Sequence, residues 1–199
     1  MVCSQSDIGL AGNGCITRGM FCFTLILREL IFLFFYNTIT DRLSEKPLMT
    51  AVLKKILEWI KSDHSTEREA GLLALEKWIE KNKDMTTLDL SCYHLGEYAV
   101  KVCEHLSKLP NLTSLNLYLN DLGEHAVDAC EHLSKLPNLT TLDLGGNNLG
   151  EHAVKACEHL SKLPNLTNLN LRYNGLREHA VDACEHLSKL TNLATLDLE

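Results

Sequence analysis

Histidine and cysteine can bind metals or act in catalysis, and this chain of 199 residues contains 9 His and 8 Cys. Six of the histidines form pairs seven residues apart, at equivalent places of a repeated segment: His125 with His132, His152 with His159, and His179 with His186. Residues seven apart on a helix lie about 10.5 Å apart along its axis, too far to share a zinc ion bound at about 2.0 to 2.1 Å. We therefore expect no specific metal site. The stacked histidine rows instead predict a surface whose charge changes near about pH 6.5.

The cysteines follow the same repetition and not the pattern of a disulfide framework. Four of them recur at a spacing of 27 residues, each on the apolar side of a predicted helix: Cys103, Cys130, Cys157 and Cys184. Free cysteine on such a face behaves as a small core hydrophobe, which favours a reducing, cytoplasmic compartment. Cys92 lies close to His94 in sequence, but nothing around the pair is typical of an activated nucleophile. We expect an exposed thiol there, no catalytic residue and no cofactor.

A leucine-containing pattern returns every 27 residues along the second half of the chain, at Leu88, Leu115, Leu142, Leu169 and Leu196. In the third unit, residues 139–149 have the spacing L-x-x-L-x-L-x-x-N-x-L. Residues 86–199 therefore form four full units and a truncated fifth.

The spacing within each unit predicts a short strand that turns outward at an asparagine. Alternate leucines place one face of the strand in the core, and the Asn side chain can bond backbone groups at the turn. Each such hydrogen bond contributes about 1 kcal/mol. We assign this structural role to Asn120, Asn147 and Asn174, whereas the first unit has Tyr93 at this position and is predicted to be the atypical repeat on the capping side.

A helix is predicted after each turn, as in residues 123–137 of the second unit. Glu124 and Lys135 match the helix dipole at its two ends, and Pro137 stops it. Its apolar face is predicted to consist of Ala126, Val127, Cys130, Leu133 and Leu136.

A strand, a turn and a full helix in each unit resemble the ribonuclease-inhibitor-like subclass of leucine-rich repeats, also seen in Ran GTPase-activating proteins and in the C-terminal repeats of NOD-like receptors. The resemblance covers residues 86–199. It implies an α/β solenoid with parallel strands on the concave side and helices on the convex side. No position matches an active-site motif of the family.

The segment before the repeats, residues 49–85, predicts a helical hairpin with helices over 50–61 and 66–83. Thr66 and Glu69 have the spacing of a capping box at the start of the second helix. We expect this N-terminal helical cap to cover the open hydrophobic end of the solenoid. An independent binding role is the alternative.

Residues 1–48 differ in kind from the rest of the chain. The stretch 20–36 is strongly apolar but has Arg28 and Glu29 at its centre, which makes a bilayer-spanning helix marginal. Three interpretations stay open: an appendage outside the native fold with Met49 as the true start, a membrane-associating segment, or a buried helix. At the other end, the strand of the fifth unit has no following helix, so we expect an open edge available for self-association or for a partner.

Charge separates the classes of partner. Residues 86–199 contain 8 Lys/Arg against 15 Asp/Glu, whereas 1–48 and 49–85 are each balanced. An acidic solenoid should repel the phosphates of nucleic acids and attract a basic protein surface.

The predicted concave face is the expected binding surface, because the repeats diverge there while their helices are nearly copies. Two positions after each strand vary, and we expect four of the residues there to anchor a partner: Tyr118, Leu119, Arg172 and Tyr173. Beside them runs a column of polar residues: Asp89, Asn116, Asp143 and Asn170. Neutral drift of exposed positions is the alternative explanation.

The sequence therefore predicts a protein-protein interaction module. Two other functions stay open: a regulatory repeat fragment of a NOD-like receptor-type protein, and a GTPase-activating protein resembling the Ran activator. Both rest on the resemblance in fold.

Overall fold

Five three-residue strands form one parallel sheet in which the order of the strands is their order in the sequence. The strands are β1 (Thr87–Asp89), β2 (Ser114–Asn116), β3 (Thr141–Asp143), β4 (Asn168–Asn170) and β5 (Thr195–Asp197). Each pairs with the next at a shift of one repeat, so that Leu88 lies beside Leu115 and Leu115 beside Leu142. This computed structural model describes residues 46–199, and side chains from Met49 onward. The predictions for residues 1–45, including the apolar stretch 20–36, lie outside the described residues.

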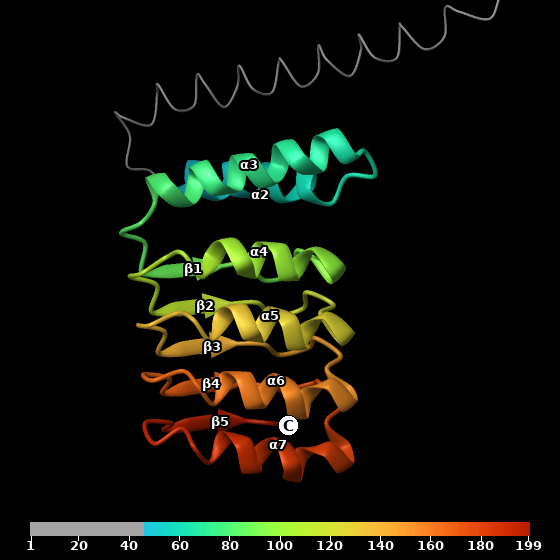
Figure 1. Cartoon of the computed structure of the whole chain (residues 1–199), viewed down its shortest axis with the longest axis vertical. Helices are drawn as coiled ribbons and strands as arrows, with labels where there is room; N and C mark the ends of the chain where they lie inside the picture. Colours follow the sequence, from blue (N-terminus) through green and yellow to red (C-terminus); the bar gives the residue numbers. More distant parts are fainter. Residues whose placement is uncertain (1–45) are drawn as a thin grey trace, which may run out of the picture. The chain divides into compact units, whose positions relative to one another are not determined.

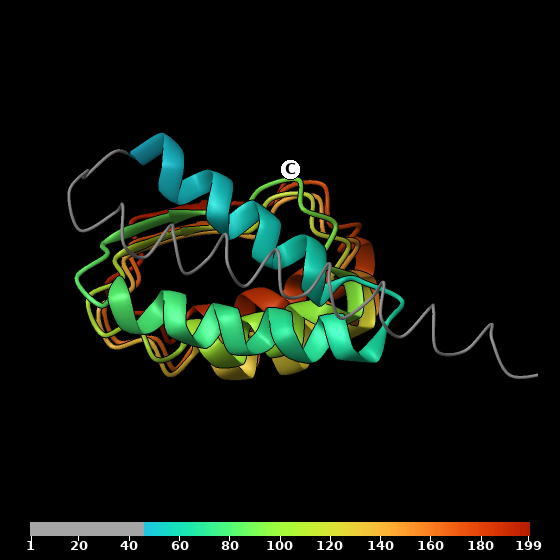
Figure 2. The same ribbon diagram turned by 90° about the horizontal axis from the view of Figure 1, so that it is seen from above.

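A helix follows each of the first four strands, and these helices pack side by side in the same order (Figure 1). They are α4 (Ala99–Leu106), α5 (Ala126–Leu133), α6 (Ala153–Leu160) and α7 (Ala180–Leu187). Viewed along the stack, the strands lie on one side and these helices on the other (Figure 2). The predicted α/β solenoid is confirmed, with buried leucines of both layers filling the space between them.

The predicted helix over residues 123–137 is shorter in the structure, because its first turn is a separate 3-10 turn. Such turns precede all four repeat helices: η2 (Gly96–Tyr98), η3 (Gly123–His125), η4 (Gly150–His152) and η5 (Arg177–His179). The α-helical hydrogen bonding of α5 ends at Leu133, where the Ser134 hydroxyl donates to Glu131 O at 2.6 Å. The helix therefore ends before the proline that was predicted to stop it.

One residue on the predicted apolar face of this helix was also wrong. Ala129 is fully buried with Ala126, Cys130 and Leu133, whereas Val127 is half-buried. The equivalent Val181 of α7 has 78% of its surface exposed. The buried residues have the i, i+3, i+4, i+7 spacing of one face of an α-helix, and Val127 lies beside this face.

Two longer helices, α2 (Lys46–Ile60) and α3 (Ser65–Lys81), precede the repeats. Between residues 51 and 81 both bury apolar side chains: Val52, Leu53, Ile56, Leu57 and Ile60 from α2, and Leu75, Trp78 and Ile79 from α3. Gly71 allows α3 to approach the end of α2, since a Cβ there would lie 2.8 Å from the Ile60 backbone N. On its other side α3 packs against α4.

The predicted capping box is wrong. The residue that caps α3 is His64, without a side-chain hydrogen bond, and Thr66 is already inside the helix. The turn before α3 is held by Ser62, whose hydroxyl donates to Glu67 Oε2 at 2.5 Å and whose carbonyl accepts from Arg68 Nη1 at 2.7 Å. The helix begins one residue earlier than the pattern predicted, which displaces Thr66 and Glu69 from capping positions.

Among the helices between residues 46 and 199, none has both the length and the apolar character needed to cross a bilayer.

Candidate functional site on the sheet face

The sheet face is the side of β1–β5 that is turned away from the helices, together with the turns that leave these strands. In β1 to β4 the middle leucine is buried and its two neighbours are more accessible, as in β2, where Ser114 and Asn116 flank Leu115. In the last strand, β5, the middle residue Leu196 is half-buried. Side chains alternate along a strand, so the residues beside the buried leucines lie on the sheet face. Tyr118 and Arg172, at the next positions in this alternation, belong to the same surface.

Left-handed backbone recurs at three positions of every turn. The first position holds Cys92 (φ 62°), Leu119 (55°), Gly146 (67°) and Tyr173 (56°). The second holds His94, Asp121, Asn148 and Gly175, and the third Gly96, Gly123, Gly150 and Arg177, all with positive φ. This conformation is strained for any residue except glycine, at a cost of about 1 to 2 kcal/mol. The repeat therefore imposes a backbone that Leu119 and Tyr173 adopt only with strain.

The polar column predicted to contact a partner has a structural function in these turns. The Oδ1 atoms of Asp89 and Asn116 accept the backbone N–H two residues further on, each at 2.9 Å. Asp143 and Asn170 do the same for Gly145 and Arg172, at 2.8 and 3.0 Å. Asp and Asn are both suited to this turn because they share a side-chain oxygen at the same distance from the backbone. One oxygen of each aspartate is thus used, and Oδ2 stays available.

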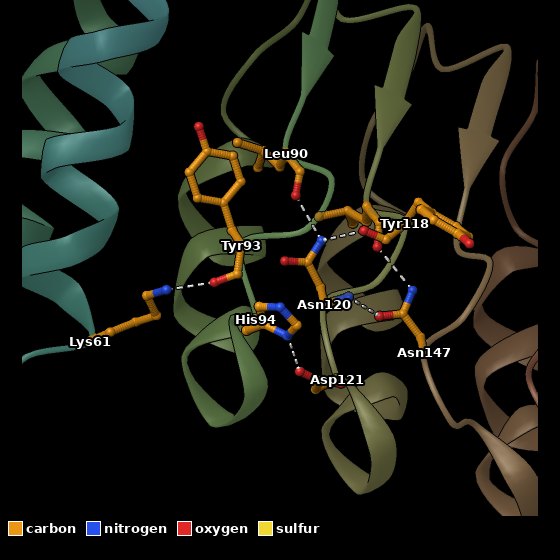
Figure 3. A network of polar contacts seen from close by, with 9 residues as sticks. Lys61, Leu90, Tyr93, His94, Tyr118, Asn120, Asp121 and Asn147 are labelled. Carbon is orange, nitrogen blue, oxygen red and sulfur yellow. Dashed lines mark hydrogen bonds and ion pairs between the residues drawn. The ribbon is translucent and has the colours of Figure 1, made fainter.

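The three asparagines to which the sequence assigned a structural role form a continuous ladder of hydrogen bonds, and Figure 3 shows its first two members, Asn120 and Asn147. Asn120, Asn147 and Asn174 are at most 2% exposed. Their side-chain amides donate across the repeat to Leu90, Leu117 and Leu144 carbonyls at 2.7, 2.9 and 2.9 Å. The side-chain oxygens of Asn147 and Asn174 accept the backbone N–H of the asparagine one repeat earlier, both at 2.9 Å.

The ladder ends at Tyr93, which occupies the asparagine position of the first unit. Asn120 Oδ1 is buried and has no hydrogen-bond partner within the described part of the chain. Two other contacts join the elements here: Lys61 Nζ donates to Tyr93 O, and His94 Nδ1 lies 2.5 Å from Asp121 Oδ2 (Figure 3). Partial burial, with the charges of Asp89 and Glu58, raises the pKa of the Tyr93 hydroxyl.

Tyr118 and Leu119 lie against the two glycines of the next repeat. A Cβ on Gly145 would lie 3.0 Å from Tyr118 Cδ2, and a Cβ on Gly146 would lie 2.7 Å from Leu119 Cδ2. Both glycines are buried by these side chains. Tyr118 and Leu119 thus pack on the backbone of Gly145 and Gly146. The sequence analysis did not assign this role to the two glycines.

Arg172 and Tyr173 form a second cluster two repeats further on. The Arg172 guanidinium carbon lies 5.4 Å from the centroid of the Tyr173 ring, and Nη1 lies 3.4 Å from Asp197 Oδ2. The Tyr173 side chain is 64% exposed. The two predicted anchor pairs therefore lie on the same face of the sheet, with the glycine pair of the third repeat between them in the sequence of repeats.

Comparison with known proteins agrees with this architecture. Residues 138–160 match the Leucine Rich Repeat family. Among solved structures, the chain is similar to one described as Leiomodin-1 Actin-Binding Site 2 (ABS2), with a TM-score of 0.54 and 17% identity over 69% of this chain and 81% of that chain. No curated protein matches the chain in sequence. The fold is an α/β leucine-rich-repeat solenoid. The ribonuclease-inhibitor-like subclass stays a prediction.

Of the five cysteines between residues 46 and 199, three are buried, and the histidines and acidic residues around them form no metal-binding cluster. No group of three His, Cys, Asp or Glu residues in this range could hold a metal ion. Burial raises the pKa of the Cys103 and Cys157 thiols to about 12 and that of Cys130 well above its usual value. Such thiols stay protonated and unreactive at neutral pH. His94, beside the exposed Cys92, is paired with Asp121.

A groove of about 840 Å³ lies at the N-terminal ends of the strands, the ends opposite to the turns described above. It is lined by Asp84 and by two rows of residues: Thr86, Thr113, Thr140 and Thr167, and Asn111, Asn138, Asn165 and Asn192. The hydroxyls of Thr113, Thr140 and Thr167 each donate to the carbonyl of the threonine one repeat earlier, at 2.9 to 3.0 Å. The asparagine amides likewise donate to backbone carbonyls. These rows brace successive repeats, so the sheet face is the stronger candidate site.

Proposed function

We propose that this chain is a protein-interaction module whose sheet face binds a protein partner with a basic surface. Tyr118, Leu119, Arg172 and Tyr173 serve as the anchors of that surface. The acidic balance of residues 86–199, 8 basic against 15 acidic side chains, supports a basic partner and argues against nucleic acid.

One observation carries the proposal: apolar side chains are exposed at positions where they also strain the backbone. Leu119 and Tyr173 are 36% and 64% exposed at φ 55° and 56°. Gly146 occupies the same position of the third repeat, so the fold accepts glycine there. Tyr173 gains little burial to offset its strain in the free protein. Strained residues with exposed apolar side chains are typical of binding sites, where a partner supplies the missing burial.

The proposal predicts that stability and binding respond in opposite directions at this position. Tyr173→Gly should raise the free energy of unfolding by about 0.5 to 1 kcal/mol, because it removes a left-handed non-glycine residue. The same variant should lose the partners that the wild-type chain captures in a cross-linking pull-down. Val181→Ala removes a comparably exposed apolar side chain from α7 and should change neither quantity much.

Two outcomes would count against the proposal. If Tyr173→Gly and a Tyr118→Ala, Tyr173→Ala double variant capture the same proteins as the wild-type chain, the sheet face is not the binding surface. If Val181→Ala loses the same partners, binding depends on the helix side instead.

A further inference from the structure

The turn after β4 holds a cation between an aromatic ring and a carboxylate. The Arg172 guanidinium lies over the Tyr173 ring, 5.4 Å from its centroid, and 3.4 Å from Asp197 Oδ2 on the next strand. Arg172 Nε also donates to the backbone carbonyl of Glu199 at 3.3 Å. Stacking on an aromatic ring combined with bonding to a carboxylate suits arginine, whose planar guanidinium offers a face and several donors.

The turn after β2 has the same backbone and lacks the cation. Tyr118 is at the position of Arg172, and Asp143 is at the position of Asp197, two repeats earlier in both cases. Ring and carboxylate adjoin here, since a Cβ on Gly145 would lie 3.0 Å from Tyr118 Cδ2 and 3.2 Å from Asp143 Oδ1. Asp143 Oδ1 accepts the Gly145 N–H, which leaves Oδ2 available. No ion pair to Asp143 is found among residues 46–199.

We propose that the corner formed by Tyr118, Leu119 and Asp143 binds an arginine side chain of the protein partner, an inference that rests on the proposed function. The guanidinium stacks on the Tyr118 ring and donates to Asp143 Oδ2. Its methylene groups contact the exposed part of Leu119. The Arg172, Tyr173 and Asp197 cluster combines the same three groups within the chain, with its guanidinium at the Tyr118 position and its ring at the Leu119 position.

Charge complementarity supports a cationic occupant at this place. The strands β1–β5 place the carboxylates of Asp89, Asp143 and Asp197 on the sheet face and contain no Lys or Arg. Their exit turns add the cations Arg172 and Arg177 and the carboxylates of Asp121 and Glu199. Arg172 is paired with Asp197. No ion pair joins Asp143 or Asp89 to a cation of residues 46–199. Asp143 lies beside Tyr118, and Asp89 lies on the strand one repeat before it.

The corner can be altered without disturbing its structural hydrogen bonds. Asp143→Asn keeps the Oδ1 acceptor and produces the residue that already occupies this column in the second and fourth repeats, at Asn116 and Asn170. Tyr118→Arg produces the residue found at the equivalent position of the fourth repeat. It should place an internal guanidinium beside Asp143, as Arg172 does beside Asp197.

The test uses a phage-displayed library of random heptapeptides selected on the immobilised full-length chain. We expect the selected peptides to be enriched in arginine. Replacing that arginine by citrulline, which has nearly the same shape without the charge, should weaken binding about tenfold or more. Asp143→Asn and Tyr118→Arg should weaken it to a similar extent. Asp128→Asn makes the same charge change on α5 and should leave binding unchanged.

The outcomes separate this inference from the proposed function. Selected peptides that lack arginine but no longer bind Tyr118→Arg would overturn the arginine site and leave the sheet face as the binding surface. Arginine-rich peptides that bind both corner variants as well as the wild-type chain would overturn the arginine site, and if Tyr173→Gly also binds them, the proposed function falls as well. Failure to select any peptide that depends on the sheet face counts against both.

Discussion

The side-chain oxygen of Asn147 accepts a hydrogen bond from the backbone N–H of Asn120 at 2.9 Å. In the other direction, the side-chain amide of Asn147 donates to the Leu117 carbonyl, also at 2.9 Å. One buried side chain thus bonds two backbone groups of the preceding repeat. The ladder of asparagines fixes the relative position of neighbouring turns, and these turns carry the proposed anchors.

Asn147→Ala should lower the free energy of unfolding by about 2 to 4 kcal/mol, because it leaves the buried Asn120 N–H and the Leu117 carbonyl without their partner. Asn168→Ala is the matched control, since Asn168 is exposed and makes a single long hydrogen bond of 3.4 Å to Thr141. It should change stability by less than about 0.5 kcal/mol. Chemical denaturation of both variants measures the difference, and equal losses would show that the ladder is not a main source of stability.

Gly146→Ala should lower partner binding by disturbing Leu119. The new Cβ would lie 2.7 Å from Leu119 Cδ2, so the Leu119 side chain must move away from its position over Gly146. Gly175→Ala is the control, because Gly175 has a similar φ of 64° and nothing lies within 4 Å of its Cβ position. Both variants should cost about 1 to 2 kcal/mol from backbone strain. Binding measured at matched folded fractions should fall only for Gly146→Ala, and a fall in both would assign the effect to strain alone.

Much of this arrangement follows from the sequence because it depends on periodicity. The spacing of Leu115 and Leu117 identified the buried side of the strand, and the spacing of 27 residues identified the parallel register. The left-handed backbone at Leu119 and Asp121 could not be predicted in this way, since neither residue type favours it as glycine does. The comparison of repeats contains one indication: Gly146 stands where Leu119 and Tyr173 stand in neighbouring repeats.

The pH dependence of stability should contain a contribution from His105. Burial, with a smaller effect of Lys108, lowers the pKa of this imidazole in the folded protein. Protonation then favours the unfolded chain, so the stabilisation is present above about pH 6.5 and is lost as the pH falls through the folded-state pKa. His105→Gln should reduce the loss of stability between pH 7 and pH 5. His64→Gln removes a histidine from an exposed turn as a control, and equal pH profiles for the wild-type and His105→Gln proteins would exclude this contribution.

The cysteines of the repeats should differ sharply in reactivity. Cys92 is exposed, whereas Cys103, Cys130 and Cys157 are buried and have raised pKa values, about 12 for the first and last of these three. Iodoacetamide at about pH 8 should therefore label Cys92 in the folded protein and leave the buried three unlabelled until denaturant is added. Mass spectrometry of the individual peptides measures each site. Equal labelling of Cys130 and Cys92 in the native protein would contradict the burial of the cysteines on the repeat helices.

The parts of the fold that sequence analysis predicted incorrectly lie at helix ends, where several hydrogen-bonding solutions compete. Thr66 and Glu69 have the spacing of a capping box, yet Ser62 and Glu67 hold the turn. In α5, Ala129 is buried and Val127 only partly so, because Ala129 continues the i, i+3, i+4, i+7 face that begins at Ala126. For the candidate site, the anchor role of the variable residues stays a prediction. The column of Asp89 and its equivalents was assigned to partner contact, and its local hydrogen bonds were not predicted.

Hydrogen–deuterium exchange tests the binding surface directly. It is measured on the full chain alone and on its complex with a partner that the wild-type chain captures in the pull-down and the Tyr173→Gly variant does not. The proposal predicts that the partner slows exchange in the peptides covering residues 114–119, 141–146 and 168–173, which contain the strands and turns of the sheet face. Peptides from α4 to α7 should change little. Slower exchange confined to these helices, with the strands and turns unaffected, would contradict the assignment of the sheet face as the binding surface.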